Sequence, residues 1–101
     1  MLKISTEYRK GVFFVRIIGR YDNGSKIKEI LDIIDELGIS NIVFNLKKLD
    51  FLSIEQIKEI YNFKENRKEK NLFIIYNQRK SRLFKNFLPN LDKELDVFSY
   101  L

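Results

Sequence analysis

The chain has 101 residues, of which 45% are hydrophobic and 33% charged, and its formal net charge is +5. This length fits one domain with one core, so we expect a single domain over residues 1–101. With 0 Cys and 0 His, the sequence excludes disulfides, thiolate or imidazole metal ligands and cysteine nucleophiles. We therefore expect no metal, no cofactor and no enzymatic activity. We also expect a cytoplasmic location, because no signal-peptide pattern or membrane-length apolar run is present.

The first half of the chain predicts a hairpin, a helix and a buried strand. Residues 4–8 and 12–19 are β-rich runs joined by Lys10-Gly11, which is typical of a hairpin. Residues 25–38 predict a helix with Ser25 as N-cap and Gly38 as C-cap. Its inward face would hold Ile27, Ile30, Leu31, Ile34 and Leu37. Residues 41–46 form a short apolar run of the kind buried on both faces of a parallel sheet.

The pattern then repeats toward the end of the chain. A second helix from residue 54 would turn one face inward, carrying Ile54, Ile57, Ile60, Tyr61 and the stem of Lys64. Residues 71–77 predict another buried strand. Residues 79–88 predict a short basic amphipathic helix that Pro89 ends, and residues 94–101 alternate as a last strand would. The expected fold is α/β in the order ββαβαβαβ, with helices packed on a mixed, mostly parallel sheet.

The start of the second helix carries Ser53, Glu55 and Gln56 in one turn. Ser53 and Gln56 have the spacing of a capping box, and Glu55 suits the positive end of the helix dipole. A well-made helix start is therefore a sufficient explanation. The functional alternative is a corner that accepts phosphate or contacts a partner at the carboxyl end of a strand, where open α/β sheets bind ligands.

Two further segments leave the same choice open. Residues 22–25, Asp-Asn-Gly-Ser, form a turn and N-cap by composition, or an exposed loop on the same edge as Ser53. Residues 64–85 hold 8 basic and 2 acidic residues, so nearly all the excess charge lies there. The clustered cations are Arg67, Lys68, Lys70, Arg79, Lys80, Arg82 and Lys85. They can be a solvated face, a surface for an acidic protein, or a site for nucleic acid or lipid headgroups.

Several strings resemble the STAS family, named for sulfate transporters and anti-sigma-factor antagonists. FFVRIIGRYD, residues 13–22, is similar to the family's second strand and Gly-x-x-Asp turn, with Gly19 and Asp22 on that pattern. IVFNLKKLDFLS, residues 42–53, is similar to its central strand and following loop, and SRLFKNF, residues 81–87, to the start of its third helix. The resemblance covers residues 4–100 and implies a single STAS-like domain.

The resemblance also places a departure at the family's phosphorylation motif. Antagonists carry Asp-Ser-Ser/Thr-Gly at the start of the second helix, where this chain has Ser53-Ile54-Glu55-Gln56. Glu55 therefore falls on the phosphoacceptor position. The family's unphosphorylated form binds an anti-sigma factor that is also a serine kinase. The resemblance thus implies a non-enzymatic bacterial regulator of transcription whose phosphoswitch is lost, unless Ser53 serves as a substitute phosphosite.

The implied partner is an anti-sigma factor or serine-kinase-like regulator. The alternative is a STAS-like cytoplasmic adaptor subunit of a membrane transporter complex, which would contact the membrane only through that complex; nucleic acid is not an expected partner. The family usually adds a helix after its last strand, and residues 94–101 leave no room for it, so we expect a homodimer or a tight partner to cover the exposed surface. The expected partner-binding residues are Asp22, Asn23, Gly24, Ser25, Lys48, Asp50, Leu52, Ser53, Glu55, Gln56 and Lys58.

Overall fold

A computed structural model describes residues 2–19, 26–49, 54–76 and 89–101 of the chain. Its elements follow in the order β1 (Leu2–Arg9), β2 (Val12–Gly19), α1 (Lys26–Glu36), β3 (Asn41–Asn45), α2 (Ile54–Glu65), β4 (Asn71–Ile75) and η2, a 3-10 helix over Glu94–Ser99. The predicted hairpin, the two helices and the two buried strands are all present. The predicted basic helix over residues 79–88 lies outside the described residues.

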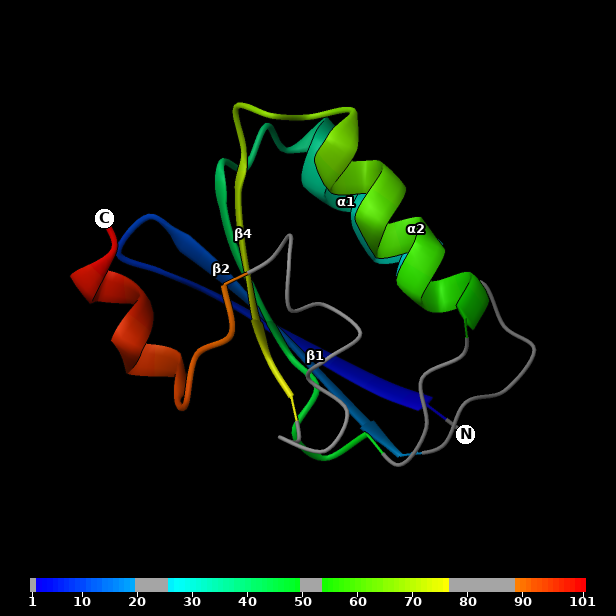
Figure 1. The fold of residues 1–101 in the computed structure, drawn as a ribbon, viewed down its shortest axis with the longest axis horizontal. Coiled ribbons are helices and arrows are strands. Elements are labelled where there is room, and N and C mark those ends of the chain that lie inside the picture. The colour runs from blue at the N-terminus through cyan, green and yellow to red at the C-terminus, as the bar shows by residue number, and fades with distance from the viewer. Residues whose placement is uncertain (1, 20–25, 50–53, 77–88) are drawn as a thin grey trace.

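The four strands form one sheet in the order β1-β2-β3-β4. β1 pairs antiparallel with β2, whereas β2 with β3 and β3 with β4 pair parallel. The predicted mixed, mostly parallel sheet is thus confirmed. Figure 1 shows α1 and α2 side by side on one face of this sheet, with η2 on the other face.

Each face of the sheet has its own apolar cluster. The helix side is the larger and includes Ile17, Ile34, Phe44 and Ile60. The η2 side joins strand residues such as Phe14 and Val43 to Leu91 and Val97 of the C-terminal segment. Successive strand residues point to opposite faces, so β3 is covered on both sides, as its run of apolar residues predicted.

Two turns of the chain use left-handed backbone conformations. Lys10 and Gly11 have φ of 51° and 81°, so both central residues of the hairpin turn are left-handed, as a type I′ turn requires. Gly38, with φ of 63°, ends α1 in the predicted C-cap conformation and donates to the carbonyl of Asp35 at 3.1 Å. Ile39 then donates to Ile34 at 3.2 Å, which turns the chain into β3.

The prediction of a last strand over residues 94–101 is wrong. The segment forms η2, in which the Asp96 carboxylate accepts the backbone N–H of Lys93 at 3.3 Å and Tyr100 donates to Val97 at 2.9 Å. Only Asn90, just upstream, bridges to β4. The expectation that a closing helix is missing therefore loses its basis, because this short helix covers the second face of the sheet.

Two residues predicted to lie on the inward faces of the helices are exposed instead. Leu37 is 65% exposed because α1 ends at Glu36 and the chain turns away there. Tyr61 is 40% exposed, and the inward face of α2 passes instead through Gln56, Ile60 and Phe63. That spacing of four and three residues is the regular helical stripe, and Tyr61 lies on its flank.

Candidate functional site: the carboxyl edge of the sheet

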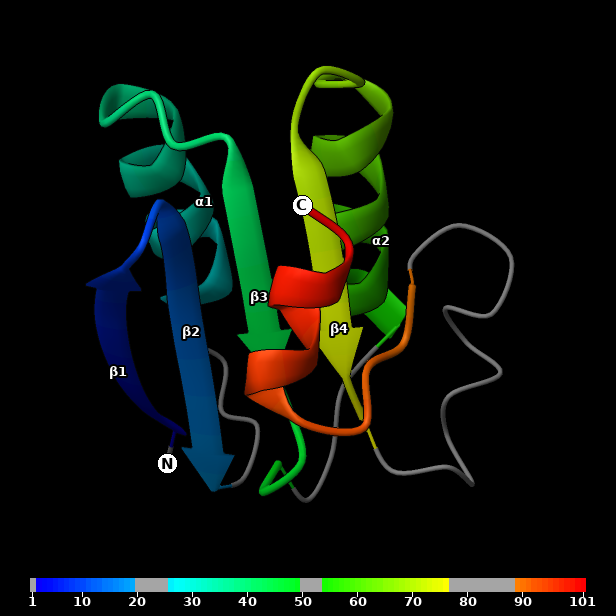
Figure 2. The ribbon, with the colours of Figure 1, turned by 90° about the vertical axis from the view of Figure 1, so that its left-hand side faces the viewer.

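The last residues of the parallel strands β2, β3 and β4 lie at one end of the sheet, where α2 also begins (Figure 2). We call this end the carboxyl edge and define it by Gly19, residues 45–49, Ile75 and the first turn of α2. The backbone N–H of Gly19 donates to the carbonyl of Lys48 at 3.2 Å, and Gly19 forms a parallel bridge with Leu49. The last residue of β2 therefore lies beside the turn that follows β3.

The turn after β3 is fixed by its own polar and apolar contacts. The Asn45 side-chain oxygen accepts the N–H of Lys47 at 3.1 Å, and Leu49 donates to the carbonyl of Leu46 at 3.1 Å. The side chains of Leu46 and Leu49 are buried. Lys47 and Lys48 are exposed, so the turn that these contacts hold carries two cations on its surface.

The structure describes four of the expected partner-binding residues. Lys48 is exposed on that turn, and Glu55 and Lys58 are exposed on α2, three positions apart and so on neighbouring parts of one helix face. Gln56 is only 4% exposed, so its inclusion in the contact surface is wrong: it belongs to the inward stripe of α2. The others lie outside the described residues: Asp22, Asn23, Gly24, Ser25, Asp50, Leu52 and Ser53.

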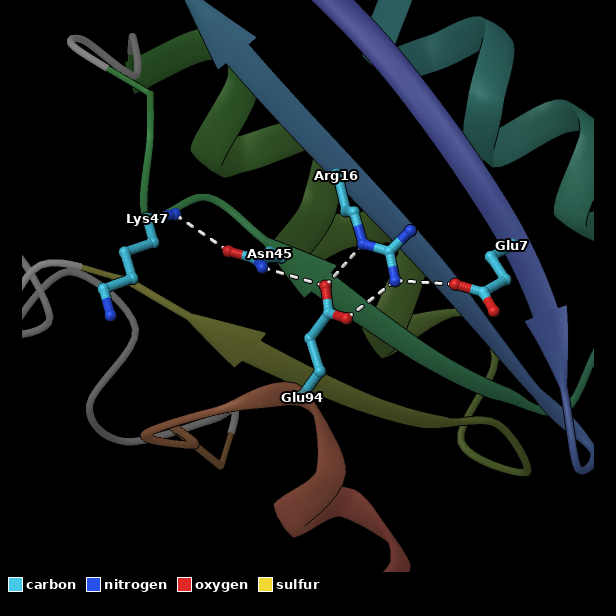
Figure 3. A network of polar contacts seen from close by, with 5 residues as sticks. All are labelled: Glu7, Arg16, Asn45, Lys47 and Glu94. Atoms are coloured by element: carbon cyan, nitrogen blue, oxygen red, sulfur yellow. Dashed lines mark hydrogen bonds and ion pairs between the residues drawn. The ribbon is translucent and has the colours of Figure 1, made fainter.

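A polar network borders this edge on the face that carries η2 (Figure 3). Arg16, on β2, donates from Nε and Nη2 to the two carboxylate oxygens of Glu94, both at 2.8 Å. Its Nη2 also donates to Glu7 of β1 at 2.7 Å, and Asn45 Nδ2 donates to Glu94 at 2.9 Å. Asn45 thus connects the turn after β3 to η2.

The network changes the ionisation of its members in the directions that pairing dictates. Hydrogen bonds from Arg16 lower the pKa of Glu94 below its ordinary value, against the effect of partial burial. The hydrogen bonds to Glu94 and then Glu7 raise the pKa of Arg16. The Arg16–Glu94 pair is therefore fully charged at neutral pH.

A cavity of about 280 Å³ opens beside this network. Its lining consists of Arg16, Ile18, Asn45, Lys47, Lys48 and Glu94. No local sequence pattern groups these residues, and only Lys48 is among the expected partner-binding residues. The available signal was a charged residue inside the apolar run VFFVRIIG, yet its partner Glu94 is 78 positions away in a segment assigned to a strand.

The basic segment lies partly at the opposite end of the sheet and is engaged there. Arg67 donates from Nε and Nη2 to the two carboxylate oxygens of Asp35 on α1, and its guanidinium lies 4.3 Å from the Phe63 ring centroid. Lys70 is 7% exposed and its Nζ donates to the carbonyl of Ile39. Arg67 thus joins the ends of α1 and α2, and Lys70 joins the segments that lead into β3 and β4. Arg79, Lys80, Arg82 and Lys85 lie outside the described residues.

Within the described ranges, no three acidic side chains come together as metal ligands. None of the helices described is both long and apolar enough to cross a membrane.

Comparison with known proteins gives a likeness in structure. No protein-family model and no curated protein sequence matches the chain. An anti-sigma factor antagonist from Mycobacterium paratuberculosis superimposes with a TM-score of 0.85 at 16% identity, over 99% of this chain and 93% of the other. The anti-sigma factor antagonist SpoIIAA in its unphosphorylated form gives 0.78 at 11% identity, over 97% and 96%. A DUF3478 protein of SpoIIAA-like fold from Shewanella loihica gives 0.64 at 15% identity, over 99% and 93%.

These identities of 11 to 16% make the likeness one of fold. The chain has the SpoIIAA-like fold of these antagonists, which is the fold that its resemblance to the STAS family implied. The fold match extends over nearly the whole length of this chain and of the antagonists.

Proposed function

We propose that this chain is a regulatory protein-binding module of the anti-sigma-factor-antagonist type. It binds its partner at the carboxyl edge, on the side where α2 begins. The observation that carries the proposal is the position of Glu55, which is exposed in the first turn of α2 in a chain with the antagonist fold. In the sequence correspondence with the STAS motif, this is the place of the phosphoacceptor.

Glu55 gives that position a fixed negative charge. A carboxylate carries about one charge, whereas a phosphoserine carries about 1.5 to 2 and has more acceptor oxygens. The charge is favourable at the amino end of a helix, where the backbone N–H groups are unpaired. This charge is smaller than that of a phosphoserine, so the module keeps the type of partner that the family's unphosphorylated form binds, and it has no hydroxyl to switch at this residue.

The neighbouring exposed cations set the chemistry of the partner. Lys48 lies on the rigid turn after β3, and Lys58 lies three residues beyond Glu55 on α2. A partner that fits this surface presents a cation toward Glu55 and carboxylates toward the lysines. Recognition of this kind needs no catalytic group, in keeping with a sequence that has 0 His and 0 Cys.

A pull-down from the host, read by mass spectrometry, tests the proposal. The wild-type chain should recover an anti-sigma factor of the serine-kinase class, and Glu55→Lys should lose it. Glu65→Lys is the matched control, because Glu65 is an exposed carboxylate at the other end of the same helix. Recovery that is equal for all three chains, or the absence of any such regulator, would contradict the proposal.

A further inference from the structure

The two outer strands of the sheet, β1 and β4, differ in how their free sides are covered. On the β4 side, Ile74 donates to the carbonyl of Pro89 at 3.0 Å and accepts the N–H of Leu91 at 2.8 Å. On the other side, β1 is eight residues long, contains no proline and pairs with β2 along its whole length without a bulge. Among the described residues, its backbone bonds only to β2. Such an edge is a template for another strand.

The hairpin fixes which backbone groups of β1 face outward. Lys10 and Gly11 are the central residues of the turn, so Arg9 and Val12 form the hydrogen-bonded pair that closes it. Hydrogen-bonded and non-bonded pairs then alternate along the ladder. The odd-numbered residues of β1 bond to β2. The N–H and C=O groups of Ile4, Thr6 and Tyr8 therefore point away from the sheet.

This alternation restricts how a second β1 strand can pair antiparallel with the first. Even-numbered residues must oppose even-numbered residues, so only a few registers are available. One places Lys3 opposite Glu7, Ile4 opposite Thr6, and Ser5 opposite Ser5 of the second copy. A shift of two positions in one direction would oppose Lys3 and Arg9, which is unfavourable for like charges. A shift in the other direction gives Lys3 only Ser5 as a neighbour.

We propose that two copies of this chain associate through their β1 edges in the register that opposes Lys3 and Glu7. The pairing joins the two sheets into one eight-stranded sheet around a two-fold axis, with two Lys3–Glu7 ion pairs. These are non-hydrogen-bonded positions of the new ladder, where side chains approach most closely. Glu7 already accepts from Arg16 at 2.7 Å, which holds its carboxylate in place for Lys3 of the second copy.

The same register covers exposed surface on the helix side of the strand. Tyr8 is 62% exposed, although its ring lies 6.5 Å from that of Phe13. In the dimer, Tyr8 comes opposite residue 2 of the second copy. A single strand pair buries less than a standard interface, so we expect a dissociation constant in the micromolar range or weaker. The strand order places β2 between β1 and β3, so the turn after β3 that carries Lys48 stays free in the dimer.

Sedimentation over a concentration series tests the dimer, and a pair of charge variants tests its register. Lys3→Glu places two carboxylates opposite each other at both pairs, and Glu7→Lys places two ammonium groups there. Each variant should therefore self-associate roughly tenfold or more weakly than wild type. An equimolar mixture of the two variants should recover association, because the mixed dimer has only opposite-charge pairs. Circular dichroism and thermal unfolding establish that each variant is folded.

Amide hydrogen exchange supplies a second test that needs no substitution. The amides of Ile4, Thr6 and Tyr8 should become more protected as the protein concentration rises. Those of Ser5 and Glu7, which already bond to β2, should not change. A wild-type chain that stays monomeric at millimolar concentration, variants that associate as wild type does, or a mixture that does not associate would each overturn the proposal.

Discussion

Arg16 and Glu94 form a two-point ion pair across 78 residues, with Nε and Nη2 each 2.8 Å from one carboxylate oxygen. The pair joins the middle of β2 to the first residue of η2. Asn45 donates to the same carboxylate at 2.9 Å, so Glu94 is also linked to the turn at the carboxyl edge. One residue of the C-terminal segment thus ties together three parts of the chain.

Glu94→Gln should therefore weaken the docking of η2. The substitution keeps the shape of the side chain but removes the charge that pairs with Arg16. We expect the free energy of unfolding to fall by about 1–2 kcal/mol, between the values for exposed and buried charged hydrogen bonds. Urea unfolding at pH 7 measures this loss. Glu36→Gln, an exposed carboxylate at the end of α1, is the control and should change little.

The lowered pKa of two carboxyl groups, those of Asp35 and Glu94, should make the stability of the fold depend on pH. Hydrogen bonds from Arg67 lower the pKa of Asp35, and those from Arg16 lower the pKa of Glu94. A carboxyl group whose pKa is lower in the folded state stabilises the fold above its unfolded pKa, which is about 4 for these residues. That contribution is lost as the pH falls through the folded pKa.

The wild-type chain should therefore lose stability steeply below about pH 4. The double variant Asp35→Asn with Glu94→Gln should start less stable at pH 7 and lose less on acidification. Thermal unfolding between pH 7 and pH 2.5 compares the two chains. Parallel curves would show that these pairs do not control the acid response.

Lys70 provides a prediction at the opposite end of the sheet. Its Nζ donates to the carbonyl of Ile39, a residue that is itself buried. Lys70→Met keeps the apolar stem but leaves this carbonyl without the ammonium donor, so we expect a loss of roughly 1–2 kcal/mol in unfolding free energy. Lys68→Met, at an exposed position two residues earlier, should stay within about 0.5 kcal/mol of wild type. Equal losses would contradict this structural role for Lys70.

The sequence predicts the elements with strong local patterns and misses those that long-range contacts decide. The hairpin follows from Lys10-Gly11, α1 from its helical spacing, and β3 from a run of apolar residues buried on both faces. The segment Glu94–Ser99 alternates like a strand, yet its Glu94 binds Arg16 and its Val97 fills the second apolar cluster. Both contacts depend on strands far away in the chain, so local periodicity could not reveal them.

The candidate site was predictable to a similar degree. The carboxyl ends of parallel strands meet at one edge, so Lys48 and the start of α2 could be placed there from element order. The burial of Gln56 could not, because its spacing fits both a capping box and the inward stripe of α2. The Arg16–Glu94–Asn45 network could not be predicted from the sequence, because it forms only when three segments come together in space.

Phosphate transfer can test whether Glu55 occupies the phosphoacceptor position. The wild-type chain, Glu55→Ser, and Glu55→Ser combined with Ser53→Ala are each incubated with ATP and the host's serine-kinase anti-sigma factor, and phosphate is measured by intact mass. We predict no phosphate on the wild-type chain and one phosphate on each Glu55→Ser variant. Phosphate on the wild-type chain, or none on either variant, would contradict the assignment of Glu55 to the phosphoacceptor position.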